Sequence, residues 1–83
     1  MASLDELRLG QRARVQALLG EDGITQRLME MGLLEDEEVE VIGLAPLGDP
    51  IEIRLQNYRL SLRRSEASRV LVLPLASPPP QAT

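Results

Sequence analysis

The chain has 83 residues, and nine basic residues against thirteen acidic ones give it a formal net charge of −4. Because phosphate contacts dominate affinity for nucleic acids, this balance argues against a nucleic-acid partner. Cysteine and histidine are both absent, which excludes disulfides, thiolate chemistry, imidazole metal ligands and a histidine general base. We therefore expect no catalysis by this chain and no resident metal or cofactor.

Length and hydropathy limit the architecture and the location. One domain is expected, with a core of Leu, Ile, Val, Met and Ala, because Tyr58 is the single aromatic residue. No apolar run approaches the roughly 20 residues of a membrane-spanning helix. The N-terminus also lacks the basic-then-apolar order of a signal peptide. The chain is thus expected in the cytoplasm, without direct insertion into a membrane.

Residues 3–19 predict a helical turn followed by a first strand. Ser3 with Glu6 three residues later resembles a capping box. Residues 11–19 alternate between apolar and polar side chains, which is the period of a strand with one buried face. That face is expected to hold Ala13, Val15, Ala17 and Leu19.

A single helix is predicted from about Ile24 to Met31. Asp22 is suited to cap its N-terminus, and Gly32 is suited to end it, with Leu33 placed for the hydrophobic contact that accompanies such an ending. The helical spacing predicts a buried stripe of Ile24, Leu28 and Met31, with Thr25, Gln26 and Glu30 facing water.

Residues 35–40 hold the densest run of carboxylates in the chain. Hard cations bind carboxylate oxygens, but this run lacks the Asp and Gly spacing of a calcium loop. A solvated turn is therefore favoured over a metal site.

Residues 39–56 predict a long β-hairpin with an unusual tip. Its connector is A-P-L-G-D-P, residues 45–50, in which two prolines lack an N–H group and Gly48 can adopt positive φ. Leu47 is the one large apolar side chain there, and it either projects into solvent as a contact residue or folds back as a lid. The buried faces of the two arms are expected to be Val39 and Val41, and Ile51, Ile53 and Leu55.

The C-terminal part predicts two further strands. Asn57 and Tyr58 are expected to form a tight reversal into a strand over 59–63, followed by one helical turn at 64–67 and an apolar strand at 70–73. Five short strands with one inserted helix describe a small all-β barrel, which we expect to be SH3-like and to span residues 1–75. The proline-rich residues 76–83 are expected to form a disordered tail.

Four sequence blocks together resemble the FeoA family of bacterial ferrous iron uptake. They are L-x-x-L-x-x-G from Leu4 to Gly10, R-L-M-E-M-G-L from Arg27 to Leu33, A-P-L-G-D-P-I-E-I-R from Ala45 to Arg54, and Y-R-L-S-L-R-R-S-E-A from Tyr58 to Ala67. The resemblance implies an SH3-like barrel without catalysis of its own. It also implies a role beside FeoB, the membrane Fe(II) transporter with a cytosolic GTPase domain.

On this reading the protein docks on the cytosolic part of the transporter and is recruited to the inner face of the membrane. Two other functions stay open: a GTPase-stimulating factor that supplies an arginine in trans, and an Fe(II) carrier or sensor that uses carboxylates alone. An exposed loop leucine also favours weak self-association. The candidate partner-binding residues are Pro46, Leu47, Gly48, Asp49 and Pro50, together with Arg63 and Arg64.

One position departs from the family pattern. Glu35 and Asp36 stand where the pattern usually has Pro and Gly. Because Asp tolerates the left-handed backbone region better than most residues, the turn is expected to survive.

Overall fold

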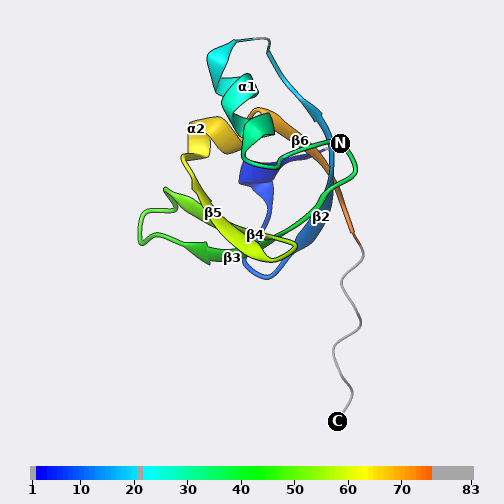
Figure 1. Cartoon of the computed structure of the whole chain (residues 1–83). Coiled ribbons are helices and arrows are strands. Elements are labelled where there is room, and N and C mark those ends of the chain that lie inside the picture. The colour runs from blue at the N-terminus through cyan, green and yellow to red at the C-terminus, as the bar shows by residue number, and fades with distance from the viewer. Residues whose placement is uncertain (1, 21, 76–83) are drawn as a thin grey trace.

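The computed structural model describes residues 2–20 and 22–75 of the chain. Its strands form one antiparallel sheet in the order β1-β6-β2-β3-β4-β5, which curls around a single core with α1 and α2 on one side (Figure 1). The predicted all-β fold with an inserted helix is confirmed. The strands are β1 (Ala2–Ser3), β2 (Arg12–Leu18), β3 (Glu38–Leu44), β4 (Ile51–Leu55), β5 (Tyr58–Leu62) and β6 (Val70–Pro74); the helices are η1 (Leu4–Glu6), α1 (Gly23–Glu30) and α2 (Arg64–Ala67). The expected tail at 76–83 lies outside the described residues.

The prediction of five strands was wrong by one. The additional strand β1 pairs Ala2 with Val72 and Ser3 with Leu71. Two residues are too few to show an alternation of apolar and polar side chains, so the sequence carries no signal for this strand.

The core is aliphatic, as predicted. Both arms of the β3–β4 hairpin bury the face that the alternation assigns to them. The largest side chains that are fully buried are Leu4, Leu28, Leu33, Ile51, Ile53, Leu55, Leu62, Val15, Val39, Val41, Val70 and Val72.

The predicted buried face of β2 is right in its first half and wrong in its second. Ala13 and Val15 are fully buried, but the pairing of β2 with β6 shifts register between Val15 and Ala17. A bulge adds one residue and therefore exchanges the faces beyond it. Leu18 consequently packs against the core, whereas Leu19 is 48% exposed.

Helix α1 begins and ends as the sequence predicts. Asp22 accepts the backbone N–H of Thr25 at 3.2 Å. At the other end Gly32 has φ +108°, and the Leu33 N–H reaches the Leu28 carbonyl at 3.1 Å, which is the bonding of a Schellman ending.

The predicted buried stripe of α1 needs a correction. Thr25 was expected to face water but is only 6% exposed, whereas Ile24 is 38% exposed. The Thr25 hydroxyl donates to the Leu19 carbonyl at 3.0 Å. Because this bond satisfies the hydroxyl, a threonine can take the inward position beside Leu28 at little cost.

The turns at residues 56–57 and at Asp36 bear on two further predictions. The β4–β5 hairpin turns at Gln56 and Asn57. Tyr58 was predicted to belong to this reversal, but it is the first residue of β5. Its hydroxyl donates to the Met31 carbonyl at 2.8 Å. Asp36 has φ +74°, so this aspartate does adopt the left-handed conformation that the turn requires.

Candidate partner-binding site

The tip of the β3–β4 hairpin is a tight turn at residues 45–50. The Gly48 N–H donates to the Ala45 carbonyl at 2.7 Å, and the Ala45 N–H donates to the Pro50 carbonyl at 3.1 Å. Gly48 has φ +81°, a backbone conformation that residues other than glycine rarely adopt. Hydrogen bonds, two prolines and this glycine thus give the loop a defined shape.

Leu47 projects from this turn into solvent. It is 94% exposed, and Leu44 at the end of β3 is 44% exposed. The alternative in which Leu47 folds back as a lid is therefore wrong. In Figure 1 the β3–β4 loop extends to one side, away from the core. The tip presents an apolar group at the most protruding part of the hairpin.

Arg64 fastens the tip to the rest of the fold. Its backbone N–H donates to the Asp49 carboxylate at 2.9 Å. Its guanidinium donates to the Gly48 carbonyl at 3.1 Å and to the Asp5 carbonyl at 3.1 Å. One side chain from the start of α2 therefore bridges the hairpin tip and η1, and it limits movement of the loop that carries Leu47.

Arg63 does not share this arrangement, although the sequence suggested equal roles for the two arginines. It is exposed, and its backbone N–H donates to the Glu66 carboxylate at 2.9 Å. The same carboxylate makes an ion pair with Arg27 of α1. Within residues 2–20 and 22–75, no ion pair involves the Arg63 side chain.

A second surface feature was missed by the sequence reasoning. A groove of about 460 Å³ lies between the end of β2 and α1. Its apolar lining includes Leu18, Met29 and Leu34, of which Met29 is 39% and Leu34 is 49% exposed. The bulged part of β2 and the inward-facing Thr25 both line this groove, and the alternation pattern predicts neither feature.

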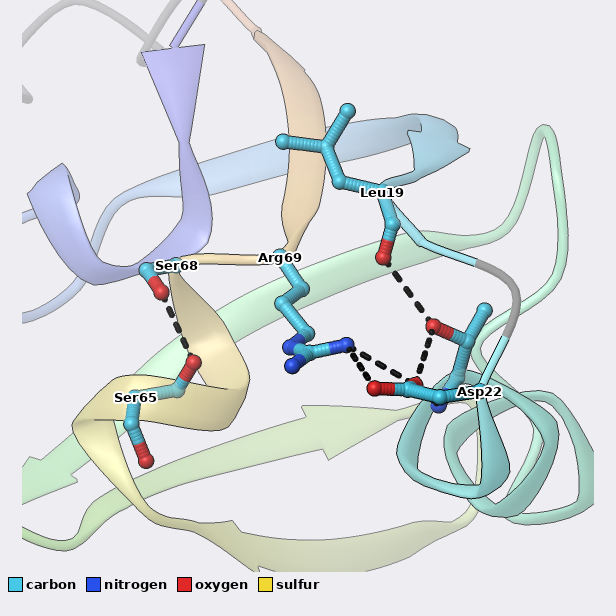
Figure 2. Close-up of polar contacts among 6 residues, drawn as sticks. Leu19, Asp22, Ser65, Ser68 and Arg69 are labelled. Atoms are coloured by element: carbon cyan, nitrogen blue, oxygen red, sulfur yellow. Dashed lines mark hydrogen bonds and ion pairs between the residues drawn. The ribbon is translucent and has the colours of Figure 1, made fainter.

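Asp22, which lines the groove, forms an ion pair with Arg69. Figure 2 shows Arg69 reaching toward Asp22 at the N-terminus of α1, with its guanidinium 2.8 Å from both carboxylate oxygens. The Arg69 guanidinium, followed by the Thr25 N–H, lowers the pKa of Asp22 below its ordinary value. This pair ties the β2–α1 loop to the start of β6.

The described residues form neither a metal site nor a membrane-spanning helix. Within residues 2–20 and 22–75, no three or more Asp and Glu side chains are grouped so as to hold a metal ion. No helix in the described part of the chain has the length and apolar character needed to cross a membrane.

Comparison with known proteins identifies the family. The family model described as the FeoA domain matches residues 2–74. The chain belongs to the FeoA family. The FeoA protein of Chlorobium tepidum, solved by NMR, is 40% identical with a TM-score of 0.82, over 89% of this chain and 70% of that one.

Two further FeoA relatives bear on fold and context. FeoA of Stenotrophomonas maltophilia, crystallised with zinc and described as an SH3 domain protein, is 38% identical with a TM-score of 0.73, over 87% of this chain and 89% of that one. An Fe(2+) transport protein A/Fe(2+) transporter FeoB fusion protein of Porphyromonas gingivalis is 35% identical over 69 residues, which are 83% of this chain and 8% of the fusion protein. The FeoA fold of this chain is thus SH3-like.

Proposed function

We propose that this chain is an accessory protein of bacterial ferrous iron uptake that docks, through the hairpin tip, on the cytosolic GTPase-containing part of an FeoB-type Fe(II) transporter. It acts in the cytoplasm and is recruited to the inner face of the membrane by this contact. The observation that carries the proposal is Leu47, which is 94% exposed on a loop that Arg64 fastens in place.

The hairpin tip is preorganised for binding. A solvent-exposed leucine gains about 1.5–3 kcal/mol when a partner buries it fully. A flexible loop would lose part of that gain on ordering, but two prolines and the Arg64 bonds have already restricted this one. The tip is therefore suited to supply a small apolar anchor to a partner surface.

The P. gingivalis relative supports the choice of partner. In that protein an FeoA region and an FeoB transporter belong to one polypeptide, so the two act at one place. In this chain the same association would have to form between separate molecules, or between parts of a longer one, and an exposed anchor meets that need.

Chemical-shift mapping tests the docking surface. The cytosolic part of an FeoB-type transporter would be titrated into isotope-labelled protein, and the largest amide shifts are expected at residues 44–50. Perturbations that avoid this tip would refute the site. A Leu47→Asp variant serves as the control, because an exposed leucine can be replaced without disturbing the core.

GTP turnover of the same transporter domain separates docking from stimulation through an arginine. Docking alone predicts binding without a large change in rate. A large acceleration that disappears when one exposed arginine, such as Arg63, is replaced by Ala would instead identify a GTPase-stimulating factor.

Calorimetric titration with Fe(II) would reveal an iron carrier as tight uptake by this chain, which the docking role does not predict.

A further inference from the structure

The two edges of the sheet are unequal. At one edge the terminal strand β1 has only two residues, Ala2 and Ser3, which pair with Val72 and Leu71 of β6. At the other edge, β5 pairs with β4 alone, and within residues 2–20 and 22–75 no strand adjoins its second side. An uncovered edge presents backbone groups that a further strand can bind.

The hydrogen bonds of Val41 in β3 determine which backbone groups of the neighbouring strands point outward. The Val41 N–H donates to the Gln11 carbonyl at 3.0 Å, and the Val41 carbonyl accepts the Gly10 N–H at 2.7 Å. The backbone N–H and C=O groups of Val41 therefore point toward the β2 side of the sheet. Because these directions alternate along a strand, the backbone groups of Glu40 point toward β4, where Glu40 lies opposite Arg54.

The same alternation continues into β5. Because the backbone groups of Arg54 face β3, its partner Arg59 forms a non-hydrogen-bonded pair with it. The N–H and C=O groups of Arg59 therefore point away from β4, and those of Ser61 do likewise two residues on. Both residues are exposed, so the edge offers two donors and two acceptors to solvent.

A row of charges crosses the sheet and ends at this edge. Successive strands place Arg12, Glu40, Arg54 and Arg59 opposite one another. Glu40 accepts a hydrogen bond from Arg54 at 2.6 Å, whereas Arg59 lies directly opposite the like charge of Arg54 and takes part in no ion pair among the described residues. An acidic residue in the next strand position would complete the alternation, because opposite charges on facing residues stabilise a sheet.

We propose that the β5 edge binds an extended segment of a partner protein by strand addition, with a Glu or Asp of that segment opposite Arg59. The outward backbone groups of Arg59 and Ser61 bind the main chain of the segment, and Arg59 selects its charge. This surface differs from the hairpin tip, so it stands or falls independently of the docking role.

Charge disfavours a second β5 as the occupant relative to an acidic segment. Antiparallel pairing of two β5 strands centred on Leu60 places the two Arg59 side chains diagonally, and centring on Arg59 places them directly opposite. Centring on Ser61 sets Arg59 against Arg63. Each register brings arginines together, and like charges across a sheet are destabilising.

The test uses two synthetic peptides, Ac-VTVEVTV-NH2 and its matched Lys form Ac-VTVKVTV-NH2. In NMR titrations the Glu peptide is expected to shift the amides of Arg59 and Ser61 and to slow their hydrogen exchange. The Lys peptide is expected to bind about tenfold more weakly. No effect at these two amides up to about 1 mM Glu peptide, or equal binding of the two peptides, would overturn the proposal.

Three variants complete the experiment. Ser61→Pro removes an outward N–H without touching the β4 ladder and should abolish binding, whereas Ser61→Ala keeps that N–H and should bind normally. Arg59→Glu should reverse the preference in favour of the Lys peptide, which remains decisive even if the proline variant fails to fold. Unchanged binding by a folded Ser61→Pro variant, or an unchanged preference in Arg59→Glu, would refute strand addition.

Discussion

Replacing Arg64 with Ala should loosen the hairpin tip, and replacing its neighbour Arg63 should not. The Ala variant keeps the backbone bond to Asp49 but loses the guanidinium bonds to the Gly48 and Asp5 carbonyls. Arg64 is exposed, so each bond belongs at the low end of the usual net range, about 0.5 kcal/mol. The free energy of unfolding should therefore fall by about 1 kcal/mol.

Thermal denaturation followed by circular dichroism measures this effect. For a domain of this size, about 1 kcal/mol corresponds to a fall in melting temperature of about 4–8 °C. Arg63→Ala is the matched control, and its change should stay within about 0.5 kcal/mol. Amide exchange at Gly48 should also quicken in the Arg64 variant alone. Equal melting temperatures for the two variants would show that Arg64 does not fasten the tip.

Three further predictions concern α1 and its surroundings. Gly32→Ala should destabilise the fold by about 1–3 kcal/mol in urea unfolding, because φ is +108° and a Cβ would lie 1.8 Å from the Tyr58 hydroxyl. Adding Tyr58→Phe should recover part of the lost stability. Absence of any recovery would contradict the clash. Leu28→Ala should cost about 2–5 kcal/mol, since Leu28 is fully buried, whereas a comparable cost for the half-exposed Met29→Ala would be inconsistent with the structure. The Arg69 guanidinium holds the pKa of Asp22 low in the folded state. The stabilisation of the fold by ionised Asp22 is therefore complete above the unfolded pKa of about 3.9 and is lost as pH falls through the lower folded pKa. Asp22→Asn should flatten this acid dependence of stability in urea titrations, and an unchanged dependence would count against the ion pair.

Much of the fold could be predicted because its signals are local. The alternation in β3 and β4, the Asp22 cap and the Gly32 ending each depend on side chains within a few residues of one another. These elements appear where the sequence places them. The left-handed turn at Asp36 follows from the same kind of local chemistry.

The errors arise where contacts with other parts of the chain determine which face of a strand or helix is buried. The bulge in β2 appears only when β6 pairs with it, and the inward Thr25 depends on a carbonyl six residues away. The candidate site shows the same division. The shape of the tip could be read from Pro46, Gly48 and Pro50, but the different roles of Arg63 and Arg64 depend on contacts with η1 and the hairpin.

Calorimetric titration of the cytosolic part of an FeoB-type transporter against wild-type protein and Leu47→Asp tests the docking role most directly. Loss of a buried leucine worth about 1.5–3 kcal/mol should weaken binding by about tenfold to a hundredfold. The variant should keep the melting temperature of the wild type, because Leu47 is 94% exposed. Equal affinities for the two proteins, with both fully folded, would contradict a docking contact at the hairpin tip.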